Sequence, residues 1–125
     1  MKIVILAACA GVLGTLLRFA AVKALGALQV DFPLGTLAVN IVGSFIAGFC
    51  WMTLKKVYPA YSEYVPVLFI GFLGAFTTFS SFALESVRFL YAAEYGKFFL
   101  NITLQNFCGI GSAAGGFLLA KIIFR

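Results

Sequence analysis

Histidine is absent from this chain of 125 residues, and charged residues of all kinds make up only 10% of it. Without histidine there is no imidazole base and no imidazole metal ligand. The sequence also lacks a cysteine-pair metal motif, a phosphate-binding glycine loop and a nucleophile constellation, so we do not expect an enzyme. A soluble domain has about 25% charged residues. The scarcity of charge therefore excludes an ordinary water-soluble domain, a disordered chain and a nucleic-acid-binding module.

Hydrophobic residues make up 63% of the chain and aromatic residues 17%. They form four long apolar runs, and a membrane-spanning helix needs about 20 mostly apolar residues. The three cysteines lie within these runs, and their odd number implies no disulfide framework. We therefore expect one all-α membrane domain, 1–125, that lies in a lipid bilayer, with spans at about 3–28, 34–54, 65–92 and 98–124.

Lysine and arginine give almost no preference for one orientation in the membrane. With four spans, both termini and the middle loop share one side, which carries five basic residues against three or four on the other. An excess of lysine and arginine near the span ends on one side sets the orientation of a membrane protein. The near-equal count favours insertion in both orientations and an antiparallel dimer. The alternative is a weak preference that a partner or the membrane potential resolves.

Arg18 lies inside the first span, where a central arginine costs about 2.5–3.5 kcal/mol on insertion scales. Gly11 and Gly14 precede it on the same helical face, so this face can pack closely against a neighbour while Arg18 reaches a polar group. The alternative is that its side chain extends to the nearer interface. In the second span, Thr36, Asn40 and Gly43 share a stripe, which is typical either of a bond between helices or of a polar track.

The third span carries the densest polar signal. From Gly71 to Phe82 it has glycines followed by a run of threonine and serine, at the depth where a span should be most apolar. The glycines and hydroxyl residues favour a break in this helix. Irregular backbone is tolerated at this depth only where it is buried in protein or lines a cavity. Freed carbonyl groups at such a break can coordinate a cation.

Phe79 and Phe82 follow the glycines at helical spacing, among hydroxyl side chains. A phenylalanine ring has a positive edge, which can favour an anion, although a stripe of phenylalanines is more often packing. In the fourth span, Gln105, Gly109 and Ser112 share a stripe that can continue a polar track. The small-residue pairs Gly111/Gly115 and Ser112/Gly116 predict close helix packing there.

At these residues the sequence resembles the Fluc (CrcB) fluoride channel family over nearly the whole chain. The resemblance rests on the glycines before Arg18, on the stretch from Gly35 through Asn40 to Ser44, and above all on Gly71 to Phe82. It implies a small antiparallel, dual-topology homodimer that passes fluoride through two pores and protects microbes from cytoplasmic fluoride. Such a protein lies in the inner or plasma membrane of a bacterium.

The resemblance also implies roles for particular residues. A structural sodium ion at the dimer centre would be held by the backbone carbonyls of Gly74 and Thr77. The fluoride pathway would comprise the two phenylalanines, the asparagine, the hydroxyl groups and the acid of these motifs, with two candidates from the fourth span: Phe79, Phe82, Asn40, Thr36, Ser80, Ser81, Glu85, Gln105 and Ser112. Arg18 would raise the local anion concentration near a pore mouth.

Two other functions compete with a fluoride channel. A small proton-coupled multidrug exporter also has four spans, but it needs a carboxylate in the first span, and residues 3–28 contain no acid. The second competing function is that of a subunit that packs against a larger membrane complex and transports nothing itself. Flux through the purified chain in liposomes distinguishes the three.

Overall fold

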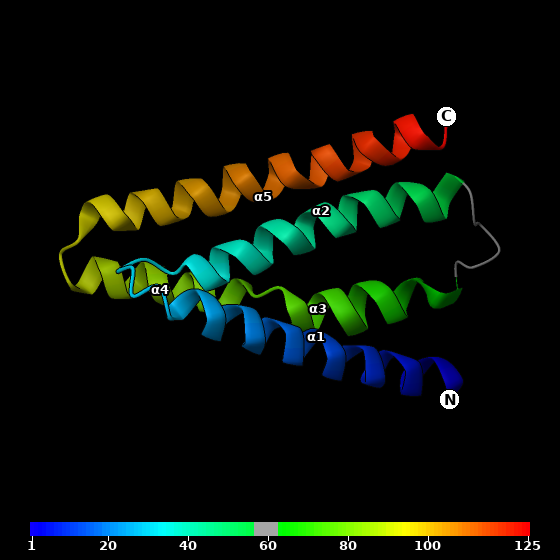
Figure 1. Cartoon of the computed structure of the whole chain (residues 1–125), viewed down its shortest axis with the longest axis horizontal. Coiled ribbons are helices and arrows are strands. Elements are labelled where there is room, and N and C mark those ends of the chain that lie inside the picture. The colour runs from blue at the N-terminus through cyan, green and yellow to red at the C-terminus, as the bar shows by residue number, and fades with distance from the viewer. Residues whose placement is uncertain (57–62) are drawn as a thin grey trace.

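The structure, a computed structural model, describes residues 1–56 and 63–125, which form helices and turns with no strand among them. Four segments are long and apolar enough to cross a membrane. The two termini lie at one end of the molecule (Figure 1). These findings confirm the expected all-α architecture. The elements are α1 (Lys2–Gly26), α2 (Leu34–Lys56), η2 (Val67–Leu73), α3 (Gly74–Phe76), α4 (Phe79–Tyr91) and α5 (Tyr95–Ile123).

The third span consists of three helical pieces instead of one helix. The first piece, η2, has the wide turns of a π-helix, a form that is frequent at functional sites. After the short α3, the backbone becomes extended at Thr77 (φ −86°, ψ 161°) and Thr78 (φ −152°, ψ 112°), and α4 follows. We call these two residues the helix break. They confirm that the third span is broken, as the sequence predicts.

Glycines allow the helices to approach one another closely. Helix α5 packs mainly on α2, where Gly116 faces the Phe45 carbonyl and Gly48 faces the Ala113 carbonyl with no room for a Cβ atom. By contrast, a Cβ atom at Gly111 or Gly115 would meet nothing within 4 Å. The expectation of close packing is therefore wrong for Gly111 and Gly115 within this chain, because helical spacing alone does not say which face meets a neighbour.

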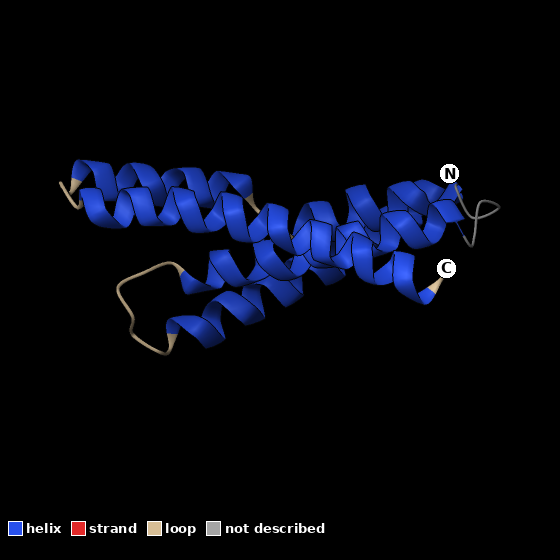
Figure 2. Ribbon diagram, turned by 90° about the horizontal axis from the view of Figure 1, so that it is seen from above, coloured by secondary structure: helices blue, strands red, loops and turns tan. Residues whose placement is uncertain are grey.

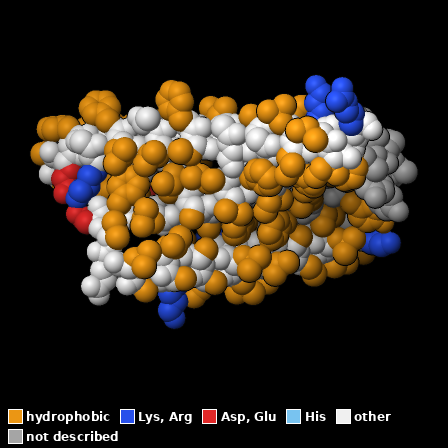
Figure 3. Space-filling model, turned by 45° about the horizontal axis from the view of Figure 1, so that its top comes forward, with side chains coloured by type: hydrophobic (Ala, Val, Ile, Leu, Met, Phe, Trp, Pro, Cys, Tyr) orange, Lys and Arg blue, Asp and Glu red, His pale blue; other side chains and the backbone are white. Residues whose placement is uncertain are grey.

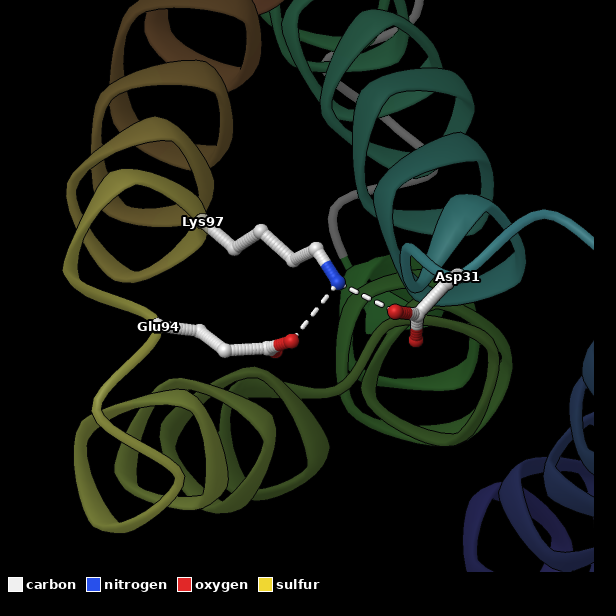
Figure 4. Close-up of polar contacts among 3 residues, drawn as sticks. All are labelled: Asp31, Glu94 and Lys97. Atoms are coloured by element: carbon white, nitrogen blue, oxygen red, sulfur yellow. Dashed lines mark hydrogen bonds and ion pairs between the residues drawn. The ribbon is translucent and has the colours of Figure 1, made fainter.

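A lysine connects the two helical hairpins at the end of the molecule opposite the termini. Figure 2 shows the hairpin of α1 and α2 and the hairpin of α4 and α5 separating toward this end. Lys97 donates to Asp31, in the loop between α1 and α2, and to Glu94 at 3.0 Å (Figure 4). Lys97 lies in the first turn of α5, which begins at Tyr95.

The outer surface matches a bilayer. Apolar side chains cover the middle of the face in Figure 3, and most of the charged side chains in this view lie toward its two ends. Large apolar side chains on several helices are mostly exposed, among them Ile70, Phe107 and Ile122. A soluble protein rarely exposes so much contiguous apolar surface, so lipid or another copy of the chain must cover it.

We expect Gly116→Ala to lower the free energy of unfolding by about 1–3 kcal/mol, because overpacking a tight contact forces backbone shifts. The added methyl group would collide with the backbone at Phe45. Reversible unfolding in detergent, followed by circular dichroism, measures this change. The matched control is Gly115→Ala, one residue away, where the space is open. Equal destabilisation by both variants would contradict this packing.

Candidate functional site

The two threonines of the helix break make hydrogen bonds to the helices on opposite sides of it. Thr77 bonds to the preceding helical segment, because its N–H and its Oγ1 both donate to the Leu73 carbonyl, at 2.9 and 2.8 Å. Thr78 caps the next helix, because its Oγ1 accepts from the Ser81 N–H at 3.1 Å. Threonine is a favoured N-cap residue for this reason. The local sequence therefore ends one helix and starts the next within two residues.

Asn40, from α2, binds both backbone groups of Thr78. Its Oδ1 accepts from the Thr78 N–H at 2.8 Å, and its Nδ2 donates to the Thr78 carbonyl at 3.1 Å. A buried backbone group without a partner costs about 1–3 kcal/mol, and Thr78 is only 8% exposed. One amide side chain thus supplies the two hydrogen bonds that the extended backbone of Thr78 cannot find within its own helix.

These contacts release two backbone carbonyls from helical hydrogen bonding. In a continuous helix the N–H of residue i+4 donates to the carbonyl of residue i. The Thr78 N–H donates instead to Asn40, and the Ser81 N–H donates instead to the Thr78 hydroxyl, so neither reaches the carbonyl of Gly74 or of Thr77. The Thr77 carbonyl accepts from Arg18 Nη1 at 3.2 Å. Of the two expectations for Arg18, the structure therefore favours a polar contact within the protein.

Gln105, from α5, joins the same network. Its Oε1 accepts the second hydrogen bond of Asn40 Nδ2, at 3.0 Å. The side chain is 8% exposed, and its buried Nε2 has no hydrogen-bond partner in the described part of the chain. The helix break, α2 and α5 are therefore linked through two amide side chains.

A cavity of about 350 Å³ lies beside this network. We call it the break cavity. Within it, Phe79 and Phe82 pack edge to face, with ring centroids 5.4 Å apart, and Phe79 is 78% exposed. None of the described residues that line it carries a charge. They are Asn40, Gly43, Ser44, Ala47, Phe69, Leu73, Gly74, Thr77, Thr78, Phe79, Phe82, Gln105 and Asn106.

Thr36 and Glu85 form a second polar contact, outside the lining of the break cavity. The Thr36 hydroxyl donates to Glu85 Oε1 at 2.5 Å, while the buried Oε2 has no partner among the residues described. Glu85 lines another cavity, of about 380 Å³, together with Asp31, Arg88 and Glu94. This loop-end cavity lies where the two hairpins separate.

Three expected hydroxyls lie elsewhere than in the break cavity. Ser80 and Ser81 lie within hydrogen-bond distance of the Thr78 hydroxyl, at 3.3 and 3.0 Å, in the first turn of α4. Ser112 donates to the Ile41 carbonyl at 2.8 Å, so it connects α5 to α2. The structure therefore brings Asn40, Gln105, the two phenylalanines and the residues of the break together in the break cavity, whereas Ser80 and Ser81 reach this group only through the Thr78 hydroxyl and Ser112 does not line the cavity.

Sequence reasoning assigned no role to Thr78 or to a buried pair beyond the break. Thr78 both caps α4 and binds Asn40, and the signal for it was a favoured N-cap residue directly before the apolar residue Phe79. Asn101 is fully buried and donates to the Ser86 hydroxyl at 3.0 Å. Ser86 in turn donates to the Phe82 carbonyl at 2.8 Å. This pair fixes α4 against α5.

Together, the fold and the site define a multi-pass membrane protein in which a broken helix lines a cavity with uncharged polar groups among apolar side chains. The chain belongs to the CrcB family: the model described as CrcB-like protein, Camphor Resistance (CrcB), matches residues 5–117.

Curated relatives match over most of their length and most of this chain. A protein of Desulforapulum autotrophicum named fluoride-specific ion channel FluC is 38% identical, over 93% of this chain and 94% of its own. Proteins of the same name in Parabacteroides distasonis and Legionella pneumophila strain Lens are 37% and 40% identical, over 90% and 93% of this chain and 88% and 87% of theirs. With its four spans, the chain is a multi-pass protein of the bacterial plasma membrane.

We expect Asn40→Leu to lower the free energy of unfolding by about 2 kcal/mol or more, because both backbone groups of Thr78 lose their partner. Chemical unfolding in detergent measures this change. Asn106→Ala is the control, since the Asn106 amide is exposed and donates to the Ile102 carbonyl of its own helix. A loss in Asn40→Leu no greater than that in Asn106→Ala would show that the break does not depend on Asn40.

Proposed function

We propose that this protein is a passive channel that carries fluoride out of the bacterial cytoplasm. The observation that supports this most strongly is the break cavity, in which amide and hydroxyl groups lie beside two phenylalanine rings and no described lining residue is charged. Relatives that match most of the chain are named fluoride-specific ion channels. The chain is accordingly a channel and not an enzyme.

A fluoride pore must replace the water around a small, strongly hydrated anion and still release the ion. N–H and O–H groups replace the water, and the positive edges of Phe79 and Phe82 contribute further. Because these groups are neutral, binding stays weak enough for the ion to leave, as conduction requires. The pathway we propose continues from Asn40 and Gln105 through the hydroxyls at the start of α4, then past Thr36 and Glu85 to the loop-end cavity. Ser112 joins it from α5 only if its bond to Ile41 opens.

A second copy of the chain, in the opposite orientation, completes the pore in this proposal. Phe79 is 78% exposed, and Gly74, whose carbonyl the break releases, also lies on the surface. Lipid cannot supply a hydrogen bond to a released backbone group, so protein must cover this face. The near-equal count of basic residues on the two sides supports an antiparallel homodimer.

In this proposal the carbonyls of Gly74 and Thr77 hold a sodium ion at the centre of that dimer, and the Thr77 carbonyl, which has two lone pairs, also accepts from Arg18 Nη1. Sodium is bound by oxygen atoms, and unwound backbone carbonyls of broken membrane helices are a recurrent source of them. Gly74 and Thr77 are the residues whose helical donors are diverted by Asn40 and by the Thr78 hydroxyl. When bound, the ion would hold the two subunits together. It would not be the permeating ion, because a cation is of the opposite sign to fluoride.

We expect the double variant Phe79→Ile, Phe82→Ile to abolish fluoride efflux from liposomes while it still forms a dimer. The reason is that isoleucine keeps the apolar volume but has no ring edge to face an anion. A fluoride electrode outside loaded liposomes measures the efflux. The control is Phe99→Ile, Phe107→Ile, two exposed rings of α5 that do not line the break cavity.

Undiminished flux through the Phe79, Phe82 variant would contradict the role of the ring edges. The wild-type assay also distinguishes the competing functions. Fluoride flux alone supports a channel, proton-coupled flux of an organic cation indicates a multidrug exporter, and no flux indicates a subunit of a larger complex.

Replacing sodium with a large organic cation is expected to weaken the dimer, because such a cation does not fit between carbonyl oxygens. Size-exclusion chromatography in detergent, with sodium or the organic cation as the only cation, measures the dimer fraction. Fluoride efflux under the same two conditions should fall in parallel. If the dimer fraction and the efflux are the same in both buffers, the sodium ion has no structural role.

A further inference from the structure

Charge is distributed unequally between the two ends of the molecule. The end that carries both termini, which we call the terminus end, has one acidic residue, Glu63, and five basic ones: Lys2, Lys55, Lys56, Lys121 and Arg125. The opposite end has three residues of each sign, namely Lys23, Arg88, Lys97, Asp31, Glu85 and Glu94. In Figure 3, acidic side chains are visible only at this opposite end. The net positive charge of the chain therefore lies mainly at the terminus end.

The charges at the two ends also differ in whether the chain itself neutralises them. At the opposite end, Lys97 pairs with two acids, Asp31 and Glu94. At the terminus end, Lys121 and Arg125 take part in no ion pair among the described residues, and both are exposed. The terminus end thus presents positive charge that needs a partner from outside the chain.

Lys121 and Arg125 share a hollow in the surface with two apolar residues. The hollow has a volume of about 320 Å³ and is lined by Leu118, Lys121, Ile122 and Arg125. We call it the α5 hollow. The spacing of three and four residues places these side chains on one face at the end of α5. Leu118 is 55% exposed and Ile122 71% exposed, so the hollow offers both apolar surface and positive charge.

This combination selects an occupant that is anionic at the membrane surface and apolar below it. An anionic phospholipid has both properties, because its phosphate can pair with the two cations while an acyl chain covers Leu118 and Ile122. Arginine binds a phosphate group through two parallel hydrogen bonds, and basic residues beside a span attract anionic lipids. A free phosphate ion would match only the cations, and a lipid without net charge would match only the apolar side chains.

A second copy of the chain does not supply the missing negative charge. In an antiparallel dimer the partner brings its opposite end to the same depth in the membrane, and the acids Asp31 and Glu94 of that end are already paired with Lys97. A copy in the same orientation would bring a second terminus end, which is basic as well. Charge complementarity therefore favours a lipid over another protein chain at the α5 hollow.

We propose that the α5 hollow is a binding site for an anionic phospholipid, which pairs its phosphate with Lys121 and Arg125. In the antiparallel dimer of the proposed function, each surface of the membrane has one such site, because the two subunits present their terminus ends to opposite surfaces. The site is separate from the proposed fluoride pathway, since none of its four residues lines the break cavity or the loop-end cavity.

Native mass spectrometry of the purified protein, with phosphatidylglycerol or phosphatidylcholine added to the detergent, measures the affinity for each lipid. We expect the wild type to bind phosphatidylglycerol more tightly than phosphatidylcholine. The double variant Lys121→Gln, Arg125→Gln should bind phosphatidylglycerol about 30-fold more weakly, since each basic residue near the surface contributes about five-fold. The matched control is Lys2→Gln, Lys55→Gln, which removes two exposed charges from the same end but outside the hollow. It should keep an affinity close to that of the wild type.

Four results would overturn this assignment. An undiminished affinity in the Lys121, Arg125 variant would show that the hollow does not bind the lipid, and an equal loss in both double variants would show a diffuse effect of charge. Displacement of phosphatidylglycerol by millimolar inorganic phosphate would indicate a site for a soluble anion. A smaller dimer fraction of the Lys121, Arg125 variant in size-exclusion chromatography would indicate that a second copy of the chain covers the hollow.

Discussion

The pair of hydrogen bonds between Asn40 and the Thr78 backbone is the contact on which the rest of the site depends. At span depth there is no bulk water to bind an unwound backbone, so an extended residue there persists only if protein supplies its partners. Asn40 supplies both, at 2.8 and 3.1 Å. Without it, Thr78 would gain most by returning to a continuous helix, and the break would close.

The break at Thr78 changes the hydrogen bonding both of the preceding helical segment and of α5. Toward η2 it releases the carbonyls of Gly74 and Thr77, one of which accepts from Arg18. Toward α5 it fixes the orientation of the Gln105 amide. The hydrogen bonds of this one side chain thus free two carbonyl oxygens, which suit a cation, and leave one amide nitrogen, Gln105 Nε2, which suits an anion. In the proposed function, neutral groups would hold both ions through dipoles, which suits a site that must release the permeating ion.

Much of this architecture could be predicted from the sequence, because apolar length and misplaced polar residues are local signals. The four spans and the break after Gly74 are of this kind, and the stripe that contains Asn40 identified the correct face of α2. The partners of that face could not be predicted. Asn40 and Gln105 are 65 residues apart, and Ser112 lies on a polar stripe yet donates to Ile41. Helical spacing defines a face, but only tertiary packing decides what that face meets.

Contact between the Gln105 amide and fluoride can be tested directly on the wild-type protein. The chain has two glutamines, Gln29 and Gln105, and Gln29 lies exposed in the loop after α1, so it serves as an internal reference. With ¹⁵N-labelled glutamine in detergent, the side-chain NH₂ resonances of Gln105 should shift as sodium fluoride replaces sodium gluconate, while those of Gln29 stay in place. Unmoved Gln105 resonances at fluoride concentrations that support efflux would contradict a donating amide in the pathway.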